Sequence, residues 1–283
     1  MTDRFYNLLI LSDLDGTFFG DGTSLVPRNI EAVKKFKSQG GLFTFSTGRT
    51  HSNLYAAVPH PEEIVNAPMS LGNGACLRDA QTSTDITRYL LDGDVGLEAA
   101  HYIRKNFPDL GLRISTTEGF MTDPDDSIAI HNLRRVAPDS IILVPEAEWT
   151  ADNWYKLVMI GSEERIAEIR PECEEHFRGR LTGDKSGKRL FELHRPDRTK
   201  ATMIENYREF YASEGRELTV CAVGDYENDR DVLLAADISV CPANATDEIK
   251  AICDLCLCAN TEGVIGDIVE YFENNYDARW AKK

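Results

Sequence analysis

The feature that most constrains this chain is an apolar run that ends at two aspartates. Tyr6 to Leu11 has the length of a buried strand, and Asp13 and Asp15 follow it, separated by one residue. Side chains alternate along an extended chain, so both carboxylates can face one pocket only if the chain stays extended beyond the strand. Carboxylates held close together raise each other's pKa unless a cation lies between them. If both carboxylates share a pocket, the pattern calls for a metal ion, a shared proton, or both; the alternative is a solvated Asp-Gly turn after a core strand.

A second strand with a polar end follows. Apolar residues at helical spacing predict a helix from Pro27 to Gln39, and Gly41 to Ser46 is predicted to be the next strand. Thr47-Gly48 at its end can present a hydroxyl and backbone N–H groups to a phosphate, and Arg49 can add a cation. The segment fits a phosphate-binding turn, and it also fits an ordinary Ser-Thr-Gly turn.

Two later segments carry further charged residues. Lys200 stands at the start of a predicted helix, where its charge is unfavourable unless an anion or carboxylates compensate it. A lone lysine at a helix start is normally solvated, so its position is only a mild indication of function, and we expect it to make no core contact. After a predicted core strand from Leu218 to Val223, the oxygen ligands of Asp225, Asn228 and Asp229 form a cluster suited to magnesium.

These segments resemble the four motifs of the haloacid dehalogenase superfamily of phosphatases. Asp13-Leu14-Asp15-Gly16-Thr17 resembles the first motif, and Gly224-Asp225-Tyr226-Glu227-Asn228-Asp229 resembles the fourth. Thr47 matches the second motif and Lys200 the third, with Ala201 where glycine is common. By this resemblance the chain is identified as a member of the Cof-like, type IIB subgroup.

The resemblance implies roles for these residues. Asp13 would attack phosphorus, and Asp15 would be the general acid and base. Phosphate would be held by a set of residues from several segments: Thr47, Gly48, Lys200, Arg49, and Asn73 of an Asn-Gly-Ala segment. A Mg²⁺ ion would be bound by Asp13, the Asp15 carbonyl and Asp225, with Asn228 and Asp229 in support.

The expected fold class is α/β, with a Rossmann-like parallel-sheet core domain and an inserted α+β cap domain of the C2B type. The chain is long enough for two domains, and strands that alternate with helices indicate an open parallel sheet. Only 29 residues separate Thr17 from Thr47, which leaves no room there for a large cap. We therefore expect core at 1–90, cap at 91–188 and core again at 189–283.

The remaining elements are predicted by their spacing. In the cap we expect helices at 98–107 and 163–177 and strands at 111–115, 140–144 and 154–161. In the core we expect a hairpin within 76–91, strands at 190–193 and 238–241, and a helix after Lys200. Cys253, Cys256 and Cys258 have a spacing that zinc sites use, but no second ligand pair is evident, and 255–259 is better interpreted as a buried strand.

Charge and composition restrict the classes of partner and the cellular location that we expect. The net charge of −16 disfavours nucleic acid and anionic membranes, and no apolar run approaches the ~20 residues of a membrane span. The polar start lacks a signal-peptide pattern, and seven cysteines without a framework spacing fit reduced thiols. We expect a cytoplasmic protein, either a monomer or a small homo-oligomer.

These predictions converge on a magnesium-dependent phosphomonoester hydrolase that forms an aspartyl-phosphate. The resemblance implies sugar phosphates or similar small phosphorylated metabolites as substrates. Two alternatives stay open: a phosphomutase of the same superfamily, which would return the phosphoryl group to its substrate, and a non-catalytic sugar-phosphate-binding protein.

Overall fold

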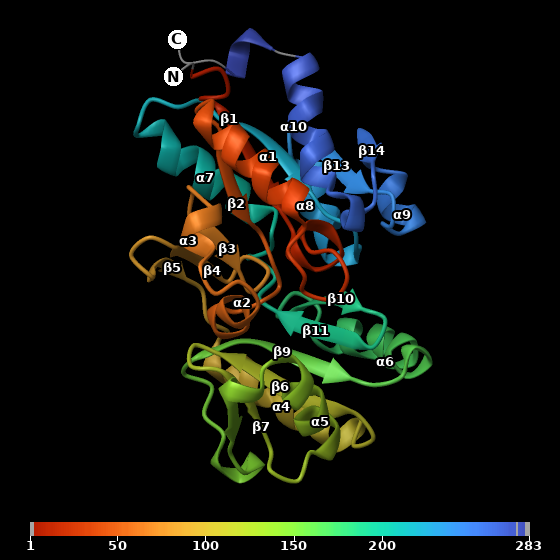
Figure 1. Cartoon of the computed structure of the whole chain (residues 1–283). Helices are drawn as coiled ribbons and strands as arrows, with labels where there is room; N and C mark the ends of the chain where they lie inside the picture. The colour runs from red at the N-terminus through yellow and green to blue at the C-terminus, as the bar shows by residue number, and fades with distance from the viewer. Residues whose placement is uncertain (1–2, 276, 281–283) are drawn as a thin grey trace. The chain divides into compact units, whose positions relative to one another are not determined.

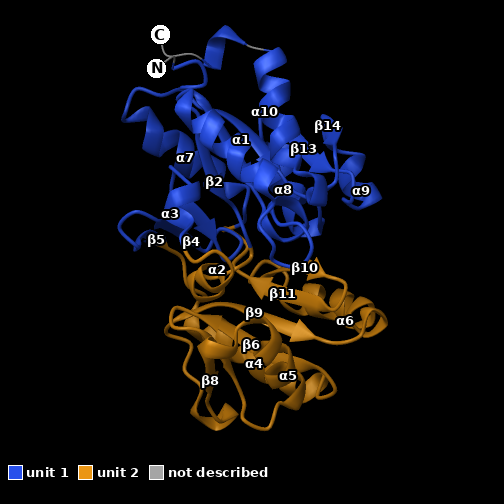
Figure 2. Cartoon of the chain, viewed as in Figure 1, with its two compact units in different colours: residues 1–47, 60–87, 199–283 blue, residues 48–59, 88–198 orange. Residues whose placement is uncertain are grey.

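The structure, a computed structural model, describes residues 3–275 and 277–280 (Figure 1). The chain forms two compact units (Figure 2). Unit 1 comprises residues 1–47, 60–87 and 199–283, and unit 2 comprises residues 48–59 and 88–198. The N-terminal and C-terminal segments of the chain thus belong to the same unit.

Unit 1 is built on a five-stranded parallel sheet with the strand order β14-β13-β12-β1-β2. Every residue of β1 and β2 is buried, which means that both faces of the sheet are covered along these two strands. The strands are β1 (Leu8–Ser12), β2 (Leu42–Phe45), β12 (Thr219–Val223), β13 (Ile238–Pro242) and β14 (Leu255–Leu257).

Helices cover this sheet. Helix α1 packs against α10, and α7 packs against α8. Helix α1 begins at Pro27, whose ring suits the first helical position, and a left-handed Gly40 (φ 91°) follows its end. The helices of unit 1 are α1 (Pro27–Ser38), α3 (Pro61–Ile64), α7 (Thr202–Ala212), α8 (Arg230–Ala235), α9 (Asp247–Lys250) and α10 (Val264–Asn274).

A second, three-stranded sheet in unit 1 has the order β3-β4-β5. It consists of β3 (Met69–Leu71), β4 (Cys76–Asp79) and β5 (Thr84–Arg88), so the hairpin predicted within 76–91 is present. A single bridge between Ser46 and Ser70 connects this small sheet to the end of β2.

Unit 2 contains a six-stranded sheet in the order β10-β11-β9-β6-β7-β8. Apolar residues on one face of this sheet pack against α4 and α6, while α5 packs against β6, β7 and β8. The strands are β6 (Gly111–Thr116), β7 (Phe120–Thr122), β8 (Ile141–Leu143), β9 (Trp154–Ile160), β10 (Thr182–Gly187) and β11 (Leu190–His194), and the helices are α2 (His51–Ala57), α4 (Gly93–Asn106), α5 (Ser127–Val136) and α6 (Glu163–His176).

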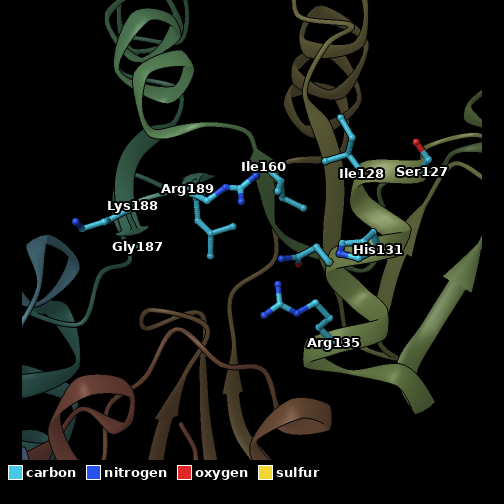
Figure 3. A pocket seen from close by; sticks show the side chains of 10 residues that line it. Ser127, Ile128, His131, Arg135, Ile160, Gly187, Lys188 and Arg189 are labelled. Carbon is cyan, nitrogen blue, oxygen red and sulfur yellow. The ribbon is translucent and has the colours of Figure 1, made fainter. Parts of the chain in front are cut away.

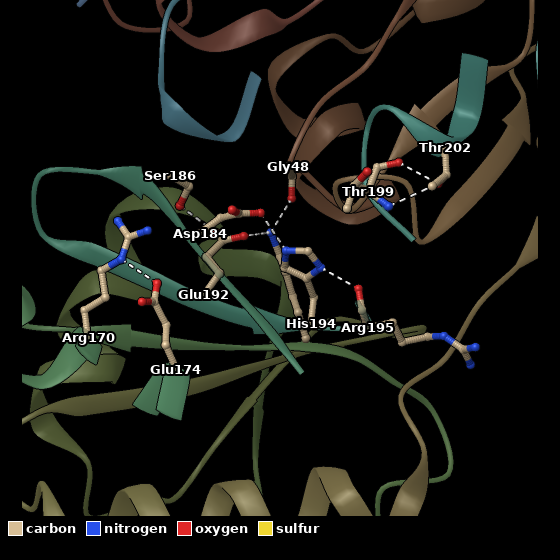
Figure 4. Close-up of polar contacts among 11 residues, drawn as sticks. Gly48, Arg170, Glu174, Asp184, Ser186, Glu192, His194, Arg195, Thr199 and Thr202 are labelled. Atoms are coloured by element: carbon tan, nitrogen blue, oxygen red, sulfur yellow. Dashed lines mark hydrogen bonds and ion pairs between the residues drawn. The ribbon is translucent and has the colours of Figure 1, made fainter. Parts of the chain in front are cut away.

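Strands β9, β10 and β11 of unit 2 carry a network of buried polar side chains (Figure 4). The Lys156 ammonium donates to Glu192 at 2.5 Å and to the carbonyl of Gly48 at 2.9 Å, and Ser186 donates to Glu192 at 2.6 Å. Burial would raise the pKa of Glu192, but the charge and hydrogen bond of Lys156, together with the hydrogen bond from Ser186, lower it. His194 lies 2.7 Å from Asp184 in the same network. Unit 2 thus contains charged groups that pair with one another inside the protein.

The predicted fold class is confirmed: an α/β protein with a parallel-sheet core and an additional sheet unit. The prediction for residues 255–259 was partly wrong, because β14 is an edge strand that ends at Leu257 and leaves Cys256 exposed. Helix α5 and strands β7 and β10 were not predicted. In the described part of the chain, no helix has both the length and the apolar character needed to cross a membrane.

Candidate active site

The site of unit 1 begins where neighbouring parallel strands end. Asp13 directly follows β1, and its N–H donates to the carbonyl of Val223 at the end of β12, at 2.8 Å. On the other side, the N–H of Ser46 donates to Ser12 at 2.8 Å. Asp13 and Thr47 therefore follow paired residues of adjacent strands, at the edge of the sheet where open α/β folds bind ligands. Both side chains are buried.

A tight turn after Asp15 brings the first and fourth motifs into contact. Gly16 has a φ of 76°, and a Cβ atom there would lie 2.4 Å from Asp225 Oδ2. Only glycine fits this conformation and this close approach. The next residue, Thr17, donates its hydroxyl to Asp225 Oδ1 at 2.8 Å. The turn thus packs against Asp225 and orients its carboxylate.

Lys200, which belongs to the third motif, forms ion pairs with a residue of the first motif and a residue of the fourth. Its ammonium lies 2.6 Å from Asp13 Oδ1 and 2.6 Å from Asp229 Oδ1, and its side chain is 0% exposed. The expectation that Lys200 makes no core contact was therefore wrong. Two carboxylates stabilise its charge at the start of α7, which is the compensation that the helix dipole requires. Burial would lower the pKa of Lys200, but Asp13 and Asp229 raise it above its usual value.

Asp229 has both carboxylate oxygens engaged within the protein. Oδ1 accepts from Lys200, while Oδ2 accepts from the backbone N–H groups of Asp225 at 3.1 Å and Tyr226 at 3.3 Å. Gly224 is packed so closely against it that a Cβ there would lie 2.4 Å from the Asp229 side chain. Asp229 therefore holds the loop after β12 in shape and positions Lys200.

The acidic groups shift one another's pKa values upward. For Asp13, burial is the largest cause, Asp229, Asp225 and Asp15 add to it, and Lys200 opposes it, so that the pKa lies well above the usual value. Burial and the neighbouring Asp229 raise the pKa of Asp225 to about 7. A single ammonium thus stands among several carboxylates, and the excess negative charge favours a further cation.

These residues fit a metal ion. Asp13, Asp225 and Asp229 each offer an oxygen within 4.8 Å of the others, and no other such group of histidine, cysteine or acidic ligands occurs among the described residues. Asp13 Oδ2 and Asp225 Oδ2 accept no hydrogen bond from the described residues. Hard carboxylate oxygens are the ligands that Mg²⁺ prefers. The aspartate cluster could hold a metal ion, whereas the three cysteines within 253–258 form no such group.

The other predicted site residues lie in different surroundings. Asp15 is exposed, but its charge is close enough to contribute to the raised pKa of Asp13 and Asp225. Asn228 is half-buried in the turn before α8. Its role and that of the Asp15 carbonyl stay predictions.

Asn73 belongs to the same strand-end region of unit 1. It is buried, has a left-handed φ of 59°, and its N–H donates to the carbonyl of Thr47 at 3.0 Å. A Cβ on the next residue, Gly74, would lie 2.3 Å from the carbonyl oxygen of Thr199, just before Lys200. The Asn-Gly turn therefore packs between the second and third motifs.

Gly48 and Arg49 belong to unit 2, although they directly follow Thr47 in the chain. The carbonyl of Gly48 accepts from Lys156, and Arg49 donates to the carbonyl of Asn53 at 3.2 Å. Their predicted contacts with phosphate stay predictions.

Two residues that support the site were given no role from the sequence. Thr17 orients Asp225 through its hydroxyl, and Asn244 donates its side-chain N–H to the carbonyl of Gly16 at 2.8 Å. Thr17 belongs to the first motif, so its place in the sequence could have indicated a role. Asn244 lies 228 residues from its partner, and only the fold brings the two together.

The raised pKa of Asp225 predicts a pH-dependent stability of the metal-free protein. Below about pH 4 this carboxyl is protonated in both states, whereas between pH 4 and 7 it ionises in the unfolded chain but not in the folded one. Stability should therefore fall as pH rises through this range, by about 2 kcal/mol once screening of this half-buried group is allowed for. Urea unfolding in chelator at pH 5 and 7.5 measures the fall, and Asp225→Asn should reduce it. An equal fall in both proteins would contradict the assignment.

Comparison with known proteins agrees with this geometry. A family model described as haloacid dehalogenase-like hydrolase matches residues 10–269. The 5-amino-6-(5-phospho-D-ribitylamino)uracil phosphatase of Bacillus subtilis is 23% identical over 266 residues, which cover 85% of this chain and 89% of that protein. The phosphoglycolate phosphatase of Methanopyrus kandleri is 26% identical over 263 residues, covering 90% and 93% of the two chains.

A solved structure has the same fold. A haloacid dehalogenase-like hydrolase from B. subtilis superimposes with a TM-score of 0.79 at 19% identity, and the match covers 93% of this chain and 99% of that one. The likeness therefore extends over both units rather than over the motifs alone.

Proposed function

Because the chain belongs to the haloacid dehalogenase-like hydrolase family, we propose that it hydrolyses phosphomonoesters through a phosphorylated Asp13, with magnesium bound beside it. The predicted enzyme class, a phosphatase of this family, is confirmed by the family match and by relatives named as phosphatases. The observation that carries the proposed mechanism is the arrangement around Lys200, whose ammonium joins Asp13 to Asp229 beside Asp225.

In the first step, a carboxylate oxygen of Asp13 forms a bond to phosphorus while the bond from phosphorus to the ester oxygen breaks. Asp15 donates a proton to the leaving oxygen. Lys200 at 2.6 Å and a bound Mg²⁺ would together favour the ionised form of Asp13, whose pKa is otherwise raised by burial and the neighbouring carboxylates. Asp15 is exposed, so it is accessible to substrate and water for proton exchange.

In the second step, Asp15 takes a proton from a water molecule that attacks the phosphoryl group. The bond between phosphorus and Asp13 breaks, which releases inorganic phosphate and restores the Asp13 carboxylate. Asp15 ends the cycle protonated, as it began. The same residue therefore acts as acid in one step and as base in the next.

The residues that would hold Mg²⁺ are Asp13, the Asp15 carbonyl and Asp225, with Asn228 and Asp229 in support. When bound, the ion supplies positive charge that offsets the carboxylates and polarises the phosphoryl group. Thr17 supports this arrangement because its hydroxyl bond to Asp225 Oδ1 leaves Oδ2 available.

The phosphoryl oxygens would be held by the Thr47 hydroxyl and the Lys200 ammonium, with the N–H of Gly48, Arg49 and Asn73 as further contacts. Asn73 supports this set through its backbone bond to Thr47 and its neighbour's close packing against Thr199. These roles follow the motif positions of the family, and the strand-end positions in unit 1 are compatible with them.

Unit 2 would act as the cap that selects the substrate. We propose a small phosphorylated metabolite, because the two named relatives act on small phosphorylated molecules of different chemistry. A cytoplasmic location agrees with the seven free cysteines. The cap boundaries at 91–188, the sugar-phosphate class and the oligomeric state stay predictions.

Activity should depend on magnesium. Without a divalent cation, Asp13, Asp15, Asp225 and Asp229 would repel an anionic ester, so we expect turnover to fall at least about 100-fold in chelator. Re-addition of Mg²⁺ should restore it, which excludes irreversible unfolding as the cause. Full activity in excess chelator after metal stripping would refute the metal assignment.

A turnover screen over phosphorylated metabolites with Mg²⁺ tests the function itself. Free phosphate as product supports the hydrolase, while an isomeric phosphate ester would identify a mutase. No turnover of any ester by a protein that still binds phosphorylated ligands would favour the non-catalytic alternative.

A further inference from the structure

Unit 2 contains a pocket of about 600 Å³ that lies apart from the aspartate cluster in the chain (Figure 3). Its walls are formed by α5 on one side and by the turn between β10 and β11 on the other, with the end of β9 between them. All of its lining residues belong to unit 2. The volume falls within the range of small-molecule sites.

The charges of this pocket are of one sign. Arg135 from α5 and Lys188 and Arg189 from the β10–β11 turn line it, and none of its lining residues is acidic. Figure 3 shows Arg135 and Arg189 on two sides of the hollow. Arg189 is held in place because its Nε donates to the carbonyl of Gly161 at 3.0 Å. In a chain with a net charge of −16, such a basic hollow favours anionic ligands.

A buried arginine, Arg113, contacts Asn132, which lines the pocket. Arg113 on β6 is 8% exposed, and no carboxylate among the described residues lies within ion-pair distance of it. Burial lowers its pKa, Glu192 opposes that effect, and Arg49 adds to it. A buried guanidinium without a paired carboxylate is costly, and a nearby anion would offset that cost.

Arg113 also sets the orientation of a residue that lines the pocket. Its Nη1 lies 3.0 Å from Asn132 Oδ1. A guanidinium can only donate, so the amide oxygen of Asn132 must face Arg113. The amide nitrogen, which can only donate, is then the polar atom left for the pocket. Asn132 thus extends the positive character of Arg113 to the pocket surface.

The rest of the lining is apolar. Ile160 and Leu190 line the pocket, and so does Ile128, whose side chain is 40% exposed. An exposed isoleucine beside cationic groups suits a ligand with an apolar part and a charged end. Cationic groups and an oriented amide among aliphatic side chains are the usual composition of a small-molecule site.

We propose that this pocket binds a small organic oxyanion, a phosphate ester or a carboxylate, whose charged end meets Asn132 and Arg135 and whose apolar part covers Ile128 and Leu190. The proposal rests on residues of unit 2 alone. Its test therefore measures binding and not turnover.

The probes are phenylphosphonate, phenylacetate and the neutral benzyl alcohol, titrated at constant ionic strength into the ¹⁵N-labelled full chain. Backbone amide signals of residues 127–135 and 187–190 report this pocket, and those of residues 13–17 and 225–229 report the aspartate site separately. We expect at least one anion to shift the pocket signals saturably, with a dissociation constant on the order of 1 mM, and the alcohol to leave them unchanged. Phenylphosphonate alone would identify a phosphate ester as the ligand, and phenylacetate alone a carboxylate.

Arg135→Gln should weaken this binding about tenfold through loss of a charge-assisted hydrogen bond, and so should Asn132→Leu. The matched control is Arg134→Gln, because Arg134 is the adjacent exposed arginine of α5 and does not line the pocket. No pocket shift with either anion at about 20 mM would overturn the proposal, since the affinity would then be negligible. Equal shifts with the alcohol, or equal weakening by Arg134→Gln and Arg135→Gln, would also overturn it.

Discussion

Replacing Asp13 by asparagine should lower the turnover of every phosphate ester by about 10⁴-fold or more, because no covalent intermediate can form without the nucleophile. The amide still fits at the end of β1 and can accept from Lys200, so the chain should stay folded. Rapidly quenched enzyme should show no added phosphoryl mass with any substrate.

Asp15→Asn should fail at a different step. The nucleophile is intact, but the proton donor and the later base are missing. An alkyl phosphate, whose leaving alkoxide needs a proton, should react very slowly, whereas nitrophenol leaves readily as a stabilised anion. With a nitrophenyl ester we therefore expect a burst of nitrophenol and phosphate that accumulates on Asp13, detectable as added mass after rapid quenching.

The comparison of the two variants separates the two roles. Wild-type turnover of the nitrophenyl ester must first establish that this substrate enters the site. If Asp13→Asn shows the burst and Asp15→Asn shows none, the roles are reversed. The burial of Asp13 beside Lys200 and the exposure of Asp15 agree with a nucleophilic Asp13 and a proton-exchanging Asp15.

Lys200→Met should abolish activity and also destabilise unit 1. The ammonium is the shared partner of Asp13 and Asp229, and its loss leaves two buried carboxylates next to each other. Breaking a buried ion pair from one side costs about 3–5 kcal/mol, and loss of the phosphate-binding charge should reduce turnover about 10³-fold. Urea unfolding and steady-state kinetics measure the two effects.

The destabilisation should be larger at pH 8 than at pH 5. Without Lys200 the pKa of Asp13 should rise further, so at pH 5 this carboxyl can take up a proton instead of repelling Asp229. Lys35→Met is the control, because its exposed pair with Glu273 should contribute less than about 1 kcal/mol. Adding Asp229→Asn to Lys200→Met should recover part of the stability and none of the activity. Unchanged stability of Lys200→Met at pH 8 would contradict the buried ion pair.

The core fold was predictable because its signals are local. Three elements of the core can be recognised from the spacing of apolar residues over a short stretch: the strand before Asp13, the helix from Pro27 and the strand before Thr47. All three are present, and their ends differ from the predicted ends by at most two residues. In unit 2 the same reasoning missed β10, whose residues Thr182–Gly187 include no large apolar side chain. That strand forms because its neighbour β11 pairs with it. Pairing with another strand cannot be recognised from the alternation of apolar and polar residues within a single segment.

Helix α5 was missed for a different reason. Within Ser127–Val136 only Ala129 and Leu133 are buried, so its apolar stripe is narrow. Its start is set by Asp126, whose side chain accepts from the N–H of Ala129 at 2.8 Å. The pocket that α5 forms with the β10–β11 turn was consequently absent from the sequence-based prediction.

The sequence by itself determined the fold class and the common location of the motif residues, because polar residues after parallel strands meet at one edge of the sheet, and the resemblance of those motifs to a family indicated the enzyme class. The tertiary structure alone decided how those charges are compensated. Lys200 lies 187 residues from Asp13 and 29 from Asp229 in the chain, and only packing shows that it is fully buried between them. The same holds for Arg113, whose burial and bond to Asn132 depend on how β6 and α5 pack. Local sequence patterns indicate secondary structure and the chemical type of the site residues, whereas burial and charge pairing are properties of the packed chain.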